Sequence, residues 1–354
     1  MNQFDHLFYV RVTESCNLSC DHCFIPKNPK NMTGNALDSV KEKIAKVTKD
    51  GETILIQFHG GEPTLAGIKK IKRLIDSLES DTSRKYKFSI QTNLMRLNDD
   101  WIALFHKHFD SEIGISWDYG IRKLDGSSEA FESAFWDNVK TLKENKITAN
   151  LVITTTKIFM DWIAYNSEYF FDKLVEHGVE NVQLERITKV GLARQNWDVI
   201  GLSNREFSES MALLYVLHRN YVSLNSCRLS ITPFDDLELD IEKLANGEAN
   251  GGSGCLSGVC DKRFHTIDSN GYKVGCTALN SEVDNAFADD TVAIRFFEPD
   301  EIVTARQERT ASCESCEFNK ICNTGCLSVT KLDESGECSG AKHLLKTINQ
   351  VTKL

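Results

Sequence analysis

The first two thirds of the chain alternates strand-like and helix-like segments, and this order constrains the fold more than any other feature. Six short segments have the apolar patterns of strands, and they lie at 8–12, 53–58, 86–90, 113–117, 151–156 and 179–187. Stretches with apolar residues at helical spacing separate them, as at Leu37, Val40 and Ile44. Strands that alternate with helices in this way form a parallel sheet with right-handed crossovers. We therefore predict an α/β fold built on a partial (β/α)6 barrel of the TIM type.

Cysteine is the unusual component of this sequence, with 12 residues in a chain of 354. The N-terminus, MNQFDHLF, lacks the basic and apolar regions of a secretory signal. The longest apolar run, Met211 to Leu217, covers seven residues, whereas a membrane span needs about 20. In a reducing compartment, clustered thiols bind metal more often than they form disulfides. The sequence therefore predicts a cytoplasmic metal-binding protein without a membrane partner.

The charge balance argues against nucleic acid as a partner. The chain has 41 Lys and Arg against 51 Asp and Glu, a net charge of −10 at pH 7. No block of basic residues stands out in the sequence. Binding to phosphate backbones depends on such basic patches, so we expect none.

The composition changes near Asn246, which suggests a second domain. The segment NGEANGGSG is rich in glycine, and eight of the 12 cysteines follow it. The region between Cys255 and Cys338 shows little helical periodicity, so we expect metal rather than a large core to stabilise it. We predict a barrel domain at 1–235, a linker at 236–254, a cysteine-rich domain at 255–340 and a closing helix at 341–354.

The first cysteine group follows the first strand directly. Cys16, Cys20 and Cys23 have the spacing C-x3-C-x2-C. Loops after barrel strands form the reactive face of this fold class. A structural zinc site needs a fourth ligand, and His22 lies beside Cys23, where its side chain should point away. A [4Fe–4S] cluster usually has four cysteine ligands, so three leave one iron open to an added molecule.

A second motif follows the second strand, in the sequence FHGGEPTL. It contains Gly60, Gly61, Glu62 and Pro63. Glycines let the backbone approach a ligand closely, and a glutamate accepts a hydrogen bond from an ammonium group. Taken alone, the segment also fits an ordinary turn between a strand and a helix.

Together, the cysteine triplet and this motif resemble the radical S-adenosylmethionine (SAM) superfamily. The resemblance implies that the open iron binds SAM, and that reductive cleavage gives a 5′-deoxyadenosyl radical that abstracts hydrogen from the substrate. It also implies that Gly60 to Pro63 hold the methionine end of SAM, and that His22 offers its backbone to the adenine. Asn93 and Ser116, at the ends of the third and fourth strands, would help to bind SAM. Alternatively, they cap the helices that follow.

The second cysteine group lies in the last third of the chain. Cys313, Cys316, Cys322 and Cys326 have the spacing C-x2-C-x5-C-x3-C, and Cys338 follows after eleven residues. With the upstream thiols, this group resembles the SPASM domain of radical SAM enzymes that modify peptides and proteins. The resemblance implies two auxiliary [4Fe–4S] clusters, three in all, one held by Cys255, Cys260, Cys276 and Cys326 and the other by Cys313, Cys316, Cys322 and Cys338. A pair of four-cysteine zinc sites has the same number of ligands.

The resemblance indicates the class of reaction better than the reaction itself. Our leading hypothesis is a maturase that cross-links a ribosomally made peptide. The main alternative is oxidation of a protein Ser or Cys to formylglycine, as in sulfatase maturases. Those enzymes place an acidic base after the cysteine equivalent to Cys276, where this chain has Thr277. Asp118 or Glu185 could replace that base.

Cys227 remains outside the three groups. It is either a buried small hydrophobe or a hydrogen donor of the kind used by radical epimerases, which makes peptide epimerisation a third hypothesis. A non-enzymatic iron–sulfur protein would need neither the triplet nor the glycine motif. The resemblance further implies a low-potential electron donor, such as flavodoxin or ferredoxin. No leader-binding domain fits ahead of Phe8, so we expect the barrel mouth, the surface of the SPASM-like domain or a separate protein to recognise the peptide.

Overall fold

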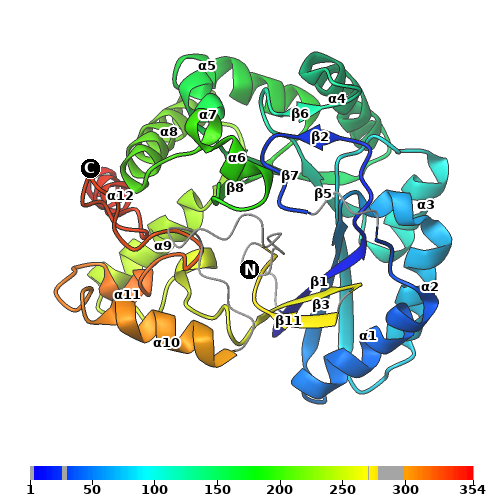
Figure 1. Cartoon of the computed structure of the whole chain (residues 1–354). Coiled ribbons are helices and arrows are strands. Elements are labelled where there is room, and N and C mark those ends of the chain that lie inside the picture. Colours follow the sequence, from blue (N-terminus) through cyan, green and yellow to red (C-terminus); the bar gives the residue numbers. More distant parts are fainter. Residues whose placement is uncertain (1–3, 26–29, 270, 278–298, 354) are drawn as a thin grey trace.

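A nine-stranded sheet forms the centre of the molecule (Figure 1). The computed structural model describes residues 4–25, 30–269, 271–277 and 299–353. The strands lie in the order β11-β10-β1-β3-β4-β5-β7-β8-β9. Six of them are the predicted parallel strands: β1 (His6–Thr13), β3 (Thr53–Gly60), β4 (Lys85–Thr92), β5 (Glu112–Ser116), β7 (Thr148–Thr155) and β8 (Asn181–Arg186). The prediction of a partial α/β barrel is confirmed.

Three further strands extend this sheet at its two edges, and the sequence patterns did not indicate them. β9 (Ser230–Thr232) pairs with β8, while β10 (Phe264–Asp268) pairs in parallel with β1. β11 (Gly271–Val274) forms an antiparallel hairpin with β10. The cysteine-rich region therefore shares one sheet with the barrel. A separate two-stranded sheet joins β2 (Ser19–Cys20) to β6 (Arg122–Lys123).

Helices surround the outer face of the sheet (Figure 1). Those of the barrel are α1 (Gly34–Val47), α2 (Ile68–Glu79), α3 (Asp99–His108), α4 (Ser128–Glu144), α5 (Lys157–His177), the short α6 (Leu192–Gln195) and α7 (Trp197–Ile200), and α8 (Asn204–Asn225). Two 3-10 turns are η1 (Pro63–Ala66) and η2 (Gly254–Leu256). The C-terminal third adds α9 (Phe234–Ala245), α10 (Pro299–Thr310), α11 (Asn319–Cys322) and α12 (Lys342–Val351).

The structure contains a helix in part of the expected linker, and it contains the expected closing helix. Helix α9 occupies the first half of the segment at 236–254, because Phe234, Leu237 and Ile241 are buried on one helix face against the core. The glycine-rich sequence covers only the part after it. The closing helix is present as α12, which packs against α8 and α9 through Leu344, Leu345 and Ile348. The division of the chain into domains stays a prediction.

The alternating burial along the strands gives the barrel a polar interior. In β3, Ile54, Ile56 and Phe58 are fully buried in the core that the outer helices share. Gln57 and His59 lie on the opposite face and are only partly buried. The same alternation puts polar side chains on the inner face of β8, at Gln183 and Glu185. In an ordinary TIM barrel, branched apolar side chains fill this space. The interior of this barrel is therefore suited to polar ligands.

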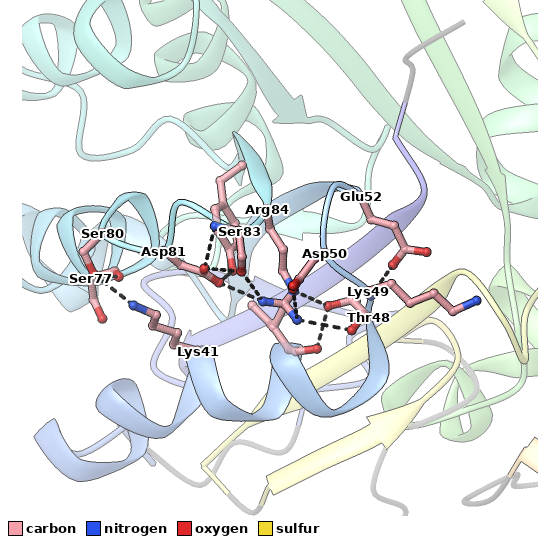
Figure 2. Close-up of polar contacts among 12 residues, drawn as sticks. Lys41, Thr48, Lys49, Asp50, Glu52, Ser77, Ser80, Asp81, Ser83 and Arg84 are labelled. Atoms are coloured by element: carbon pink, nitrogen blue, oxygen red, sulfur yellow. Dashed lines mark hydrogen bonds and ion pairs between the residues drawn. The ribbon is translucent and has the colours of Figure 1, made fainter.

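A polar network stabilises the edge of the sheet where the strands begin (Figure 2). Arg84 donates to the Thr48 hydroxyl at 2.8 Å and to the Asp81 carboxylate at 3.1 Å. Asp81 also accepts bonds from the amide and hydroxyl of Ser83 and from the hydroxyl of Tyr86 at 2.9 Å. These bonds join the end of α1 to the start of β4. This network therefore stabilises the edge where the strands begin. In barrel enzymes the active site lies at the other edge, where the strands end.

We expect Asp81→Asn to lower the free energy of unfolding by about 1–3 kcal/mol at pH 7, because charge-assisted bonds are lost. The hydrogen bonds from Ser83, and those from Tyr86 and Arg84, hold the pKa of Asp81 well below its ordinary value. A depressed pKa stabilises the fold above the unfolded pKa of about 3.9, and this contribution is lost as the pH falls further. Urea titrations at pH 7 and pH 3 should therefore show a smaller difference between variant and parent at pH 3.

Asp76→Asn is the matched control for this prediction. Asp76 pairs with Lys72 at 3.1 Å, but its side chain is 55% exposed, whereas that of Asp81 is 10% exposed. An exposed pair of this kind contributes little to stability. Equal losses in the two variants would contradict the role assigned to Asp81.

Candidate functional site

The loop after β1 brings the three cysteines of the first group together. Cys20 is buried, Cys23 is half-buried and Cys16 is exposed. The pKa of the Cys20 thiol is raised to about 12, mainly by burial; Arg122 opposes this rise, and the nearby thiols of Cys23 and Cys16 contribute to it. The three sulfur atoms are thus close enough to influence one another. This placement fits three ligands of one cluster.

The segment at 191–196 packs against the cysteine loop. The amide of Leu192 donates to the carbonyl of Cys23 at 2.8 Å, and the side chain of Asn196 donates to the carbonyl of Asp21 at 2.8 Å. Gly191 has a φ of +56°, and a Cβ atom there would lie 2.5 Å from the carbonyl oxygen of Cys23. Only glycine fits between these two loops without moving one of them. The sequence offered no signal for this contact.

The glycines of the second motif have a role that the sequence did not reveal. A Cβ atom on Gly60 would lie 2.1 Å from the carbonyl oxygen of Thr13, and one on Gly61 would lie 2.4 Å from that of Ser15. The amides of Gly61 and Glu62 donate to these same two carbonyls at 2.9 and 2.8 Å. We expected the glycines to let a ligand approach. In the structure they let the start of the cysteine loop pack on the motif.

Glu62 is held inside the protein by four hydrogen bonds. Its Oε1 accepts from the amide of Thr64 and from the hydroxyls of Thr64 and Thr92, at 2.7–3.0 Å. Its Oε2 accepts from the amide of Asn93 at 2.8 Å. Burial raises the pKa of Glu62, and the bonds from Asn93 and Thr64 oppose that rise. Glu62 is 1% exposed. Its bonds to Thr92 and Asn93 connect the end of β4 to the glycine motif. A bond to a SAM ammonium group stays a prediction.

Asn93 and Ser116 do not cap helices, so that alternative is wrong. Asn98 caps α3, and Ser127 caps α4. The side-chain amide of Asn93 instead donates to Asn17 at 3.0 Å and lies 3.9 Å from the sulfur of Cys16. Ser116 accepts a bond from Gln91 at 2.7 Å. Asn93 thus belongs to the surroundings of the cysteine loop, and SAM binding by either residue stays a prediction. Pro63 begins η1 and is buried.

Asp118 connects the cysteine loop to β7. Its Oδ2 accepts from Arg122 Nε at 2.6 Å and lies 3.5 Å from His22 Nε2. Its Oδ1 accepts from the amide of Thr154 at 2.5 Å. Burial lowers the pKa of His22, although Asp118 opposes this. The side chain of His22 therefore faces Asp118, which agrees with our expectation that it does not complete the cysteine triplet.

The assignment of the eight C-terminal thiols to two cluster sets stays a prediction, and the thiols that influence one another are compatible with it. Cys326 forms a thiol hydrogen bond with Cys255, and both Cys276 and Cys260 lie close enough to shift a thiol pKa within this set. In the second set, the thiols of Cys338, Cys313 and Cys316 all raise the pKa of Cys322.

Zinc ions and four-iron clusters both bind sets of four cysteines. Within the residues that the structure describes, no three His, Cys, Asp or Glu side chains are arranged to hold a single metal ion. The choice between zinc and iron–sulfur clusters at these thiol sets stays a prediction.

Three arginines near these thiols were missed in the sequence. Arg306 Nη2 lies 3.7 Å from the sulfur of Cys260. Arg309 donates to the carbonyls of Cys326 and Val329 at 2.9 and 2.8 Å. Arg186 joins β8 to this region, because it donates to the carbonyl of Ser339 at 3.2 Å. Arg306 and Arg309 lie on α10, which has no regular apolar stripe in the sequence, so only their position before Cys313 could have indicated them.

The barrel interior between the two cysteine regions is lined by residues that the motifs did not indicate. The ring of Tyr9 lies edge-on to the ring of His59, with their centroids 6.2 Å apart. Burial, then Cys276 and Glu185, raise the pKa of Tyr9. Arg11 donates to the carbonyl of Thr277 at 3.2 Å and lies 3.9 Å from Asp268. These side chains connect the glycine motif to the first set of auxiliary thiols.

Cys227 lies away from these residues. It comes between α8 and β9, and Ser230 of β9 pairs with Asn181, the first residue of β8. That is the edge where the strands begin, whereas the cysteine loop follows the end of β1. Cys227 is half-buried and packs against the core. Its position favours the role of a small hydrophobe, and its use as a hydrogen donor stays an untested prediction.

The comparisons with known proteins agree with this site. Residues 10–160 match the model of the Radical SAM superfamily. This part of the chain, which includes the cysteine triplet and the glycine motif, is therefore similar to a radical SAM domain. Among the helices that the structure describes, none is long and apolar enough to cross a membrane.

Relatives of this chain include enzymes that act on sulfatases. It is 24% identical to the cysteine-type anaerobic sulfatase-maturating enzyme of Clostridium novyi, over 89% of this chain and 85% of that protein. It is 24% identical to the serine-type enzyme of Klebsiella aerogenes, over 53% of this chain and 48% of that protein. The chain thus spans most of the first relative and about half of the second.

Solved structures share the fold. Native anSMEcpe with bound AdoMet superposes with a TM-score of 0.68 at 18% identity, covering 98% of this chain and 96% of that one. Streptococcus suis SuiB bound to its precursor peptide SuiA superposes with a TM-score of 0.59 at 17% identity, covering 91% and 72%. The chain therefore shares its fold with these two proteins.

We expect Gly61→Ala to abolish SAM cleavage, because its Cβ atom would push the segment before Cys16 away from the motif. Gly34→Ala is the matched control, since the nearest atom to a Cβ there is the end of a flexible Arg73 side chain at 3.5 Å. Iron content and 5′-deoxyadenosine are measured after anaerobic reconstitution. Normal cleavage by the Gly61 variant would show that the contact with Ser15 is not required.

Proposed function

We propose that this enzyme is a SPASM-type peptide maturase that abstracts hydrogen from a residue of a ribosomally synthesised peptide and forms an intrapeptide cross-link. The observation that carries this proposal is the arrangement of thiols around a polar interior. The cysteine triplet follows β1, and Cys276, Cys255 and Cys260 lie close enough to Tyr9 to raise its pKa, as does Glu185. A substrate in this interior would lie between the radical source and an auxiliary cluster.

Eleven of the 12 cysteines suit three [4Fe–4S] clusters, as one set of three and two sets of four. With iron and SAM bound, the triplet site would supply a carbon-centred radical that removes a hydrogen atom. The chain positions this site through the backbone contacts of Gly60 and Gly61 with the segment after β1. Asn93 and Ser116 remain our candidates for SAM contacts, with the backbone of His22. The residues Gly60 to Pro63 would hold the methionine end.

Several observations support a peptide as the substrate. The interior is lined by polar side chains, which suits a peptide backbone better than an apolar molecule. SuiB, which shares the fold, binds its own precursor peptide. Cross-linking after hydrogen abstraction leaves one electron to remove, and two auxiliary clusters could carry it away. We further propose a low-potential electron donor such as flavodoxin or ferredoxin, a cytoplasmic location and, for leader binding, a separate protein.

The second candidate is oxidation of a protein Ser or Cys to formylglycine, which the similarity to the Clostridium novyi enzyme favours. That reaction needs a base, and this chain has Thr277 where we expect one. Asp118 is an unsuitable substitute, because Arg122 and the amide of Thr154 already occupy its oxygens. Glu185 faces the interior and accepts a bond from Gln183. Burial raises the pKa of Glu185, so it is the better substitute if this candidate is right.

Anaerobic reconstitution should give about twelve irons per chain, as three [4Fe–4S] clusters require. The neighbouring genes should be searched for a short peptide, which would be the substrate to test first, with SAM and dithionite. We expect 5′-deoxyadenosine and a peptide lighter by about two mass units, since two hydrogens are lost. An unchanged peptide mass with deuterium gained in heavy water would instead indicate epimerisation. A protein without iron would contradict the proposal entirely.

Changing Cys16, Cys20 and Cys23 together to Ala should leave about eight irons and abolish SAM cleavage. The remaining eight thiols form two complete sets, so the auxiliary clusters should still assemble. Cys227→Ala is the control, because that thiol lies at the opposite edge of the sheet. Continued production of 5′-deoxyadenosine by the triple variant would refute the assignment of the first cluster.

A further inference from the structure

Arg122 lies beside the cysteine loop because two short strands pair there. β2 and β6 are antiparallel, with Cys20 directly opposite Arg122. The amide of Asp21 donates to the carbonyl of Ile121 at 3.1 Å and extends this pairing. Residues directly opposite each other in an antiparallel pair present their side chains on the same face. Arg122 therefore shares a face with a cysteine of the triplet.

Asp118 holds the guanidinium in this place. Arg122 Nε donates to Asp118 at 2.6 Å, and the side chains are 15% and 1% exposed. The carboxylate is itself fixed by the amide of Thr154. A charge-assisted bond of this kind is short and strong, particularly when water is excluded. The position of the positive charge is thus determined by β7 as well as by β6.

The strand register places this charge beside the triplet. Cys20, the middle cysteine, is the direct partner of Arg122, and Ser19 is the partner of Lys123. Asp118 binds the guanidinium through its Nε atom. The positive charge of Arg122 is therefore held next to the cysteine loop.

We propose that Arg122 is a positioning residue that holds a fixed positive charge beside the triplet cluster and makes this cluster easier to reduce. Reduction adds one electron from the donor to the cluster, and no bond is formed or broken. A nearby cation stabilises the added negative charge, so its removal lowers the reduction potential. The proposal rests on the proposed function only in requiring an iron–sulfur cluster on Cys16, Cys20 and Cys23.

The test compares variants that change the charge in one place. Arg122→Gln removes it, and Arg122→Lys keeps it. Lys123→Gln is the matched control, because Lys123 is the next residue on β6, pairs with Asp21 at 2.8 Å and is 34% exposed. Each full-length protein is reconstituted without SAM and titrated with dithionite under electron paramagnetic resonance. The signal of the triple Cys→Ala variant is subtracted to remove the auxiliary clusters.

We expect Arg122→Gln to shift the ratio of oxidised to reduced triplet cluster about tenfold toward the oxidised form at a fixed potential. For one electron this equals about 59 mV. Arg122→Lys and Lys123→Gln should each shift it about twofold or less. Equal shifts in Arg122→Gln and Lys123→Gln, or equal shifts in both Arg122 variants, would overturn the proposal.

Asp118→Asn keeps the proposal testable if Arg122→Gln fails to assemble the cluster. The asparagine oxygen can still accept the bond from Arg122, while the negative charge is lost. The ratio should then move toward the reduced form, and a move toward the oxidised form would contradict our proposal. If the parent protein itself has no iron on the triplet, the proposed function fails rather than this inference.

Discussion

The position of the candidate site depends on β1, which pairs with a neighbouring strand on each of its two edges. β3 lies along one edge and β10 along the other, both parallel to β1. β1 thereby joins the barrel to the cysteine-rich region in a single sheet. The cysteine loop follows β1 directly, and Cys276 follows the hairpin that begins with β10. The position of the triplet relative to the first auxiliary set is therefore determined by backbone hydrogen bonds.

Close backbone contacts give the cysteine loop its shape before any ligand is bound. Gly60 and Gly61 pack closely against the segment after β1, and Gly191 packs closely against the end of the loop. The pairing of β2 with β6 fixes the middle of the loop. A loop whose only strand among the described residues is the two-residue β2 is thus held by three different parts of the barrel. Such support is needed where side chains must keep a fixed geometry.

Much of this arrangement could be predicted from the sequence, because strong local patterns determined it. The six βα units follow from apolar periodicity, and the cysteine sets follow from their spacing. β9 and β10 could not be predicted, since strands of three and five residues depend on the neighbours that they pair with. The contact of Gly60 and Gly61 with the cysteine loop could not be predicted either, because sequence shows that a close approach is possible but not which group approaches. Arg122 gave no signal, because its importance comes from a strand pairing of only two residues.

The parallel pairing of β1 with β10 also affects the order in which the chain folds. Val10 pairs with Ile267, so this edge of β1 must wait until most of the chain has been synthesised. Until then, the strand that leads into the cysteine loop presents unpaired backbone groups, which attract other chains. Contacts between residues so far apart in sequence also form slowly. The barrel edge that carries the radical chemistry is therefore completed late, after the ribosome has made the thiols of the first auxiliary set up to Cys260.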